Sequence, residues 1–141
     1  MKLLTIKQPW CWCILFAGKD IENRVWQTPY RGPLLIHAGK GGTKSEHQRI
    51  AQVVWEEDGI RIPRFEDMPR GGIVGVVDLV GVVTEEDAQS TWFGGPYGLV
   101  LANPRPLPFY PMKGQLGLCP APKDYKLPAE TEEKFFQASF L

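Results

Sequence analysis

The amino-acid sequence predicts an α+β fold, a mixed β-barrel of five to six strands with two main helices. The chain has 141 residues, which suffices for one well-packed core, whereas two independent cores would each be marginal. Its 15 glycines and 13 prolines make up about a fifth of the residues, a content typical of short strands joined by many turns. No repeat or linker divides the chain. We therefore expect a single domain over 1–141, with a core at 3–119 and a C-terminal tail at 120–141.

The N-terminal part predicts a strand followed by a buried helix. Residues 3–6 form a short apolar run, as in a strand. Pro9 suits the first position of a helix, where its missing N–H costs nothing. Residues 10–17 are apolar on every side, which indicates a largely buried helix. Gly18 then offers the left-handed conformation that commonly ends a helix.

Residues 20–26 alternate in polarity with a period of two, which favours a strand. A half-polar strand of this kind is typical of the wall of a cleft. One face of it would carry the side chains of Asp20, Glu22, Arg24 and Trp26.

The rest of the chain alternates one clear helix with further strands. Residues 44–58 have apolar positions at helical spacing, including His47, which predicts an amphipathic helix. The valine-rich residues 73–84 give the strongest strand signal. Four prolines at 104–111 confine that stretch to an extended edge, since proline cannot donate to a ladder in mid-sheet. The other expected strands are 34–38, 97–103 and 115–119, the last closing the sheet, and the tail either forms a terminal helix or lies across the surface.

The charge balance limits the partners. Sixteen basic and sixteen acidic residues cancel. Proteins that grip long duplex DNA through many phosphates usually carry a basic excess. If the partner is a nucleic acid, we therefore expect it to be a short single strand or one nucleoside held in a pocket.

The cysteines and the hydropathy indicate the compartment. Three cysteines, an odd number with two of them only two positions apart, argue against a disulfide framework and for a reducing cytosol. Their spacing also suits zinc poorly, so we predict no metal and no cofactor. The sequence has no secretory signal and no apolar run long enough to cross a bilayer. We expect a cytoplasmic protein that makes no membrane contact; the oligomeric state stays open.

Several segments in order resemble the ASCH domain, a branch of the PUA-like superfamily. The centre of the resemblance is Lys19-x-x-Glu22-x-Arg24 directly after the buried helix. The upstream Gln8-Pro9-Trp10 resembles the variety often found in bacterial and phage genomes. Three further segments look like later parts of the family pattern, and the resemblance covers most of 3–119: 35–38, 72–80 and 113–118.

The resemblance implies a β-barrel with a cleft that binds RNA or nucleotides. Certain small members hydrolyse the acyl group from acylated cytidine, and others have been described as ribonucleases. In the amidohydrolase branch the signature lysine, a threonine and a later glutamate carry catalysis. Lys19 matches that lysine, but Glu22 occupies the position of the threonine. Binding of RNA, single-stranded nucleic acid or a modified nucleoside is therefore the leading hypothesis. The alternative is a small hydrolase, amidohydrolase or ribonuclease, with Lys19 and Glu22 catalytic.

The chemistry of the signature residues points the same way. Arg24 could hold a base edge or a phosphate with two parallel hydrogen bonds. Glu22 could accept from an exocyclic amine, and a desolvated Lys19 could act as a base or nucleophile. The alternative for Glu22 and Arg24 is that they pair with each other and brace the cleft.

Further candidate ligand contacts are aromatic, imidazole and lysine side chains. Flat rings can stack on an unpaired base, although such rings are often part of the core. His37 could act as an acid or base but is as easily a hydrogen-bonded structural residue. The remaining candidates are Trp10, Trp26, Lys40, Trp92 and Tyr97. A protein-interaction adaptor is a third possibility, with Phe109 and Tyr110 as its surface.

Overall fold

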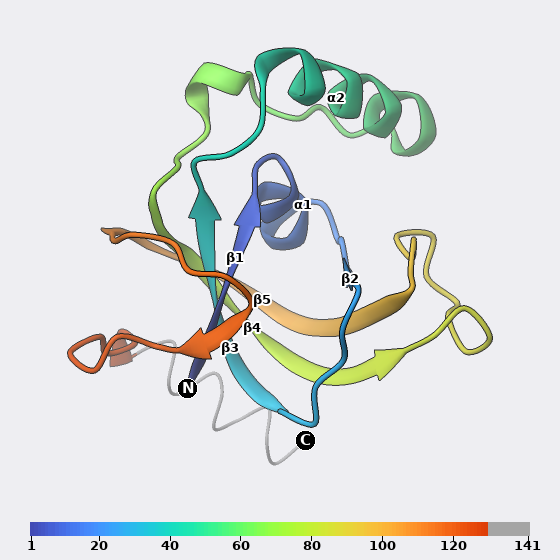
Figure 1. The fold of residues 1–141 in the computed structure, drawn as a ribbon. Helices are drawn as coiled ribbons and strands as arrows, with labels where there is room; N and C mark the ends of the chain where they lie inside the picture. The colour runs from blue at the N-terminus through green and yellow to red at the C-terminus, as the bar shows by residue number, and fades with distance from the viewer. Residues whose placement is uncertain (130–141) are drawn as a thin grey trace.

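The computed structural model describes residues 1–129 of the chain. Its six strands and two α-helices form one α+β structure of the PUA-like kind (Figure 1). In chain order the elements are β1 (Lys2–Lys7), α1 (Trp10–Phe16), β2 (Ile21–Arg24), β3 (Gly32–Gly39), α2 (Lys44–Asp58), the short 3₁₀ helix η1 (Phe65–Asp67), β4 (Gly72–Val83), β5 (Tyr97–Pro111) and β6 (Leu118–Pro120).

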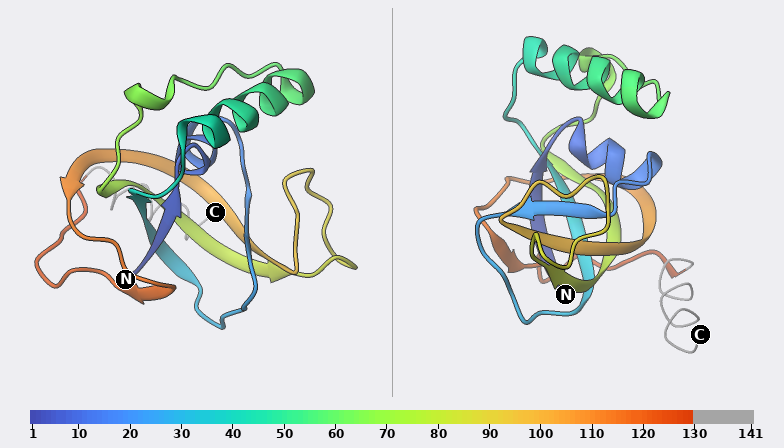
Figure 2. Two further views of the ribbon diagram at one scale, coloured as in Figure 1. Left: turned by 45° about the horizontal axis from the view of Figure 1, so that its top comes forward. Right: turned by 90° about the vertical axis from the view of Figure 1, so that its right-hand side faces the viewer.

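The six strands form a single mixed sheet. Its order is β2-β5-β4-β3-β1-β6, and β1 and β3 run parallel while the other neighbours are antiparallel. The parallel register pairs Lys2 with Leu34 and Lys7 with Gly39, so the carboxyl ends of both strands lie at one edge. Each of these two strands is followed by a helix, which places α1 and α2 above this edge (Figures 1 and 2).

The sheet curls into a half-barrel and does not close through backbone hydrogen bonds. Within the described residues, β2 and β6 are the outer strands and share no ladder, whereas we expected the last strand to close the sheet. A side chain spans the gap instead, because Arg24 Nη2 donates to the carbonyl oxygen of Thr5 at 3.0 Å. Since β6 pairs only with residues 2–4 of β1, the stretch from Thr5 to Lys7 is left uncovered at this seam.

Both faces of the sheet are buried. The inner face packs against α1 through residues such as Leu4, Ile36 and Leu99, each fully buried. The outer face, with Leu3 and Leu35, is covered by residues 121–127 of the tail. Full burial of one such side chain contributes about 1.5–3 kcal/mol. The tail therefore lies across the surface through residue 127, one of the two alternatives that we expected, and residues 130–141 fall outside the described part of the chain.

Helix α1 is short and fits tightly against the sheet. It begins at Trp10 with Pro9 as its N-cap, one position earlier than we expected for Pro9. Gly18, at φ +74°, follows the helix in the left-handed conformation. At Gly75 of β4 the helix leaves no room for a side chain, since a Cβ there would lie 2.4 Å from a methyl of Leu15. The helix is less completely buried than its sequence indicates, because Phe16 is 57% exposed.

Helix α2 has the bounds that its periodicity predicts. The Thr43 side chain accepts a hydrogen bond from the Glu46 N–H, which satisfies a free donor of the first turn. Gly59, in the left-handed conformation, ends the helix. His47, Ile50 and Val54 are buried against Cys13 of α1 and the 60–68 segment. This small second core fixes α2 above α1.

Strand β5 continues through the prolines that we expected to lie at an edge. It pairs with β4 along most of its length, whereas β2 covers only residues 97–100 on the other side. The proline-containing half is therefore a free edge, as expected, but it belongs to the same strand as residues 97–103. The expected strand over 20–26 is shorter in the structure, where only 21–24 pair with β5.

Candidate functional site

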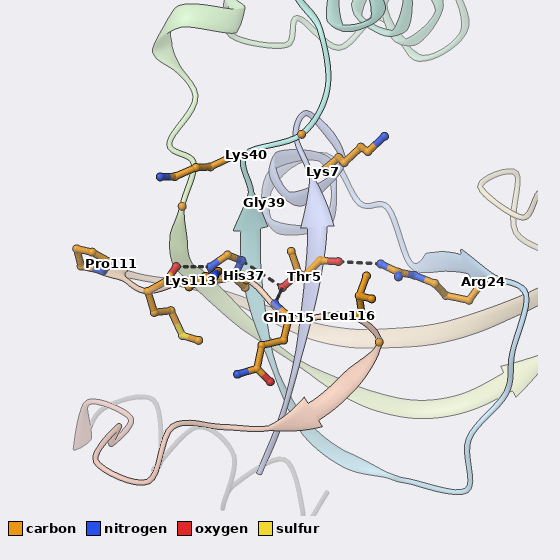
Figure 3. A pocket seen from close by; sticks show the side chains of 15 residues that line it. Thr5, Lys7, Arg24, His37, Gly39, Lys40, Pro111, Lys113, Gln115 and Leu116 are labelled. Carbon is orange, nitrogen blue, oxygen red and sulfur yellow. Dashed lines mark hydrogen bonds between the residues drawn. The ribbon is translucent and has the colours of Figure 1, made fainter.

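A cavity of about 920 Å³ opens where the sheet is not closed. It lies between the carboxyl ends of β1 and β3 and the loop that joins β5 to β6 (Figure 3). The two parallel strands place their ends side by side, and the absence of β6 beyond Leu4 exposes them. The residues lining the cavity come from five parts of the chain: Thr5, Lys7, Arg24, His37, Gly39, Lys40, Gly41, Gly71, Pro111, Met112, Lys113, Gly114, Gln115, Leu116 and Gly117.

The charged side chains of the cavity lining are all positive. The lining contains four permanent cations, namely Lys7, Arg24, Lys40 and Lys113, and no aspartate or glutamate. Over the whole chain acidic and basic residues are equal in number, so the imbalance is a local property of this cavity. Such a concave surface of one sign concentrates ligands of the opposite charge.

A chain of hydrogen bonds through His37 holds the loop that forms one wall. His37 is 1% exposed, and its Nε2 donates to the Met112 carbonyl oxygen at 2.7 Å. Thr5 Oγ1 lies 3.2 Å from His37 Nδ1 and accepts from the Gln115 N–H at 3.3 Å. The chain is complete when the ring carries its hydrogen on Nε2, because Nδ1 then accepts the Thr5 hydroxyl. Figure 3 shows Thr5, His37 and Gln115 together at the centre of the site.

The signature residues form a buried ion cluster beside the cavity. Lys19 Nζ donates to the Ile21 carbonyl oxygen and lies 3.2 Å from Glu22 Oε1. Glu22 Oε2 accepts from Arg24 Nε at 3.0 Å and lies 2.9 Å from Nη2. The side chains of Lys19 and Glu22 are 4% and 10% exposed, whereas that of Arg24 is 22% exposed. Of the three, only Arg24 lines the cavity.

Three of the predicted contacts therefore meet at the cavity, and the others lie elsewhere. Arg24, His37 and Lys40 line it. Lys19 borders a separate hollow of about 80 Å³ between α1 and the sheet, too small for a nucleoside.

None of the four predicted aromatic residues lines the large cavity. Trp10 packs under Lys19, whose ammonium is 5.7 Å from the ring centre, and Trp26 lies beneath the Arg24 guanidinium at 5.9 Å. Trp92 packs in the second core, and Tyr97 pairs with Arg24 across β2 and β5. Two of these rings, Trp10 and Trp26, therefore lie against cations of the signature cluster.

Several lining residues were not foreseen, chiefly Thr5, Lys7 and the 111–117 loop. A signal for the loop was present in the sequence. Gly114 directly follows Lys113, much as glycines flank the predicted Lys40, and such glycines suit backbone approach to an anion. Locating them in one site required knowing that β1 and β3 are parallel, because ligands often bind beyond the carboxyl ends of such strands.

Phe109 and Tyr110, the basis of the adaptor hypothesis, remain partly exposed at 47% and 38%. They lie on the proline-containing half of β5, outside the cavity lining. Proline removes backbone donors from this edge, which limits the pairing of a further strand with it. The adaptor role therefore stays a prediction.

The three thiols are buried and free. Burial, with a smaller contribution from the charge of Glu22, raises the pKa of Cys11. Burial also raises the pKa of Cys13 to about 11, and Lys19 partly opposes that rise. Within residues 1–129, no three metal-ligating side chains gather at one place, and no helix is long and apolar enough to span a membrane.

Comparison with known proteins gives one family and one curated relative in two species. The model described as the ASCH domain matches residues 4–132, which include every residue that lines the cavity. Activating signal cointegrator 1 from Homo sapiens is 25% identical over 138 residues, and the Mus musculus protein is 26% identical over the same length. The alignments cover 92% of this chain but only 23% of either relative, so the chain spans about a quarter of their length.

Proposed function

This chain belongs to the ASCH domain family, and on that premise we propose that its cavity binds single-stranded RNA or an RNA nucleotide through the phosphate backbone. The observation that carries the proposal is the charge of the lining, with four cations and no carboxylate in a chain of zero net charge. Phosphate is the anion that RNA presents at every residue, and contacts to it supply most sequence-independent affinity.

The dimensions of the cavity support a short ligand. Its volume of about 920 Å³ is at the upper end of the range of small-molecule sites, which leaves room for a nucleotide and part of its neighbours. Five glycines in the lining allow a ligand to approach the backbone closely. Since acidic and basic residues are equal in number over the whole chain, a long duplex would meet acidic as well as basic side chains beyond the cavity. Three free thiols support the cytosolic location that goes with this proposal.

The hydrolase alternative has no comparable support in the geometry. A catalytic lysine must reach the bond that it attacks, whereas the Lys19 ammonium is buried and bonded to the Ile21 carbonyl and to Glu22. Hydrolysis of acylated cytidine or RNA with Lys19 and Glu22 as catalytic residues stays a prediction that turnover assays of the Lys19→Ala variant would test.

Fluorescence titration tests the binding proposal. Labelled oligoribonucleotides of about six residues, a duplex of the same sequence and single nucleosides are titrated at several salt concentrations. We expect the single strand to bind best and log Kd to rise with log salt. Replacing Lys7, Lys40 and Lys113 by alanine should reduce that slope by about 2, because each lost contact to a single strand removes about 0.7.

The matched control is Lys123→Ala, an exposed lysine outside the cavity lining. It should change neither affinity nor slope. The absence of binding by any of these ligands, or equal binding by the triple alanine variant and the wild type, would overturn the proposal.

A further inference from the structure

Lys19 and Glu22 occupy the signature of the chain but lie behind the cavity, and this arrangement assigns them a role. We propose that they are positioning residues that direct one free nitrogen of Arg24, Nη1, at a backbone phosphate. Neither would touch the ligand. The inference rests on the proposed function and identifies phosphate as the chemical group that Arg24 binds.

A chain of contacts connects the buried interior to the cavity, with Lys19 and Arg24 both donating to Glu22. Lys19 and Glu22 join at 3.2 Å, and Glu22 holds the Nε and Nη2 edge of Arg24 at 3.0 and 2.9 Å. The Thr5 carbonyl fixes the same Nη2 from the strand across the seam. The Arg24 guanidinium is therefore held from two sides, in a residue that lines the cavity.

A count of donors indicates what Arg24 can still bind. A guanidinium has five N–H groups. Nε–H donates to Glu22, and Nη2 donates to the Thr5 carbonyl oxygen while lying 2.9 Å from Glu22 Oε2. In the described part of the chain no group accepts from Nη1, which leaves two donors on a single nitrogen. The edge that could grip a base in two parallel bonds is occupied by Glu22, so Arg24 is left to contact a single anionic group.

The charges of the cluster favour the same ligand. Two cations and one carboxylate leave a net charge of one positive unit, and the member exposed to the cavity is the cation Arg24. Lys19 balances the charge of Glu22, which would otherwise cancel that of Arg24. The sequence-independent phosphate is therefore the expected partner, with no preference between bases at this contact.

A purely structural role for Lys19 and Glu22 would predict a different pattern in a double-mutant cycle. Residues that act through Arg24 lose their effect on affinity once Arg24 is absent, whereas residues that contact the ligand or hold the whole cavity keep it. The cycle combines Glu22→Gln and Lys19→Met, separately, with Arg24→Ala. Kd is measured for oligo-U and oligo-A of equal length, and Arg31→Ala in the exposed turn before β3 is the control.

We expect Arg24→Ala to weaken binding of both oligonucleotides about tenfold, and to reduce the salt slope by about 0.7. Glu22→Gln and Lys19→Met should each weaken binding severalfold in the wild type and leave it unchanged in Arg24→Ala. If Glu22→Gln alone does not fold, the pair Lys19→Met with Glu22→Gln removes both charges at similar volume and takes its place.

Two outcomes would overturn the inference while the proposed function stands. One is an equal loss of affinity from Glu22→Gln in both backgrounds. The other is a loss in Arg24→Ala that differs between oligo-U and oligo-A, which would indicate a base contact. If the wild type binds neither oligonucleotide, the proposed function fails, and the inference fails with it.

Discussion

The molecule uses its cations in two contrasting ways on either side of one seam. Lys19 and Arg24 share the carboxylate of Glu22, and within this cluster Lys19 and Glu22 are almost without solvent contact. By contrast, Lys7, Lys40 and Lys113 line the cavity and are exposed, and within residues 1–129 none of them forms a salt bridge.

The contrast separates Lys19 and Glu22, which build the site, from the three lysines of the lining, which together with Arg24 would supply its affinity. A buried ion pair is costly to break because the remaining charge loses its partner in a medium of low dielectric constant. An exposed lysine without a partner costs little to remove but attracts a phosphate at long range. We therefore expect substitutions of Lys19 and Glu22 to act first on stability. Substitutions of Lys7, Lys40 and Lys113, the rim lysines of the cavity, should act on binding.

The largest effect is expected from Glu22→Ala. This change leaves Lys19 buried without its carboxylate and releases the Arg24 guanidinium that spans the seam. Breaking one partner of a buried pair costs about 3–5 kcal/mol, a large part of the stability of a domain of this size. Denaturant unfolding measures it, and a loss below about 1 kcal/mol would mean that the cluster is solvated in solution.

A second effect on stability, from the buried thiol of Cys13, should appear at high pH. Burial raises the pKa of Cys13 from its ordinary value of 9.0 to about 11, so the folded protein holds that proton more tightly than the unfolded chain. The stabilisation is fully present below pH 9 and is lost as pH rises towards 11. Its size is about 2–3 kcal/mol at most. Unfolding free energies from pH 8 to 11 should fall less steeply in Cys13→Ala, and an unchanged slope would contradict the burial of this thiol.

A smaller effect on stability is expected at His37, which connects β3 to β1 and to the loop between β5 and β6. His37→Leu removes the bonds to Thr5 and to the Met112 carbonyl. Both groups face the cavity and can bind water instead, so we expect a loss of about 1–2 kcal/mol. Amide exchange should report where it acts, with faster exchange at Gln115 and no change at Leu35 in the middle of β3. Equal protection at Gln115 in both proteins would show that the loop is held by other contacts.

Local sequence patterns predicted the elements well but not the site that they enclose. The bounds of α2 follow from apolar spacing, a capping threonine and Gly59, all of which are local. The family pattern drew attention to Lys19, Glu22 and Arg24, which do lie together. Their roles depend on how deeply each side chain is buried. The period-two pattern of the strand does not reveal that Glu22 is buried while Arg24 reaches the cavity.

The remaining cavity residues depend on long-range pairing. Thr5 and His37 are brought together by the parallel pairing of β1 with β3, and Gln115 meets them because β6 leaves the end of β1 uncovered. Neither the parallel register nor the short β6 has a signature in nearby residues. The placement of the aromatic residues is equally hard to derive from the sequence, since exposure of a ring depends on what the distant chain packs against it.

The smallest effect on stability is expected at the rim lysines. This prediction tests most directly the difference between the buried cluster and the exposed cations. Replacing Lys7, Lys40 and Lys113 by alanine should change the unfolding free energy by no more than about 0.5 kcal/mol per site, because each side chain is exposed and unpaired in the described structure. The same variant should respond differently to ligand. A six-residue oligoribonucleotide at about 100 times its Kd would stabilise the wild type by about 2.7 kcal/mol, and this gain should shrink in the variant as its Kd rises. Thermal melts with and without the oligonucleotide measure both quantities. If the variant unfolds more easily without ligand but keeps its full gain with it, the rim lysines belong to the architecture and the division drawn between the two groups of cations is wrong.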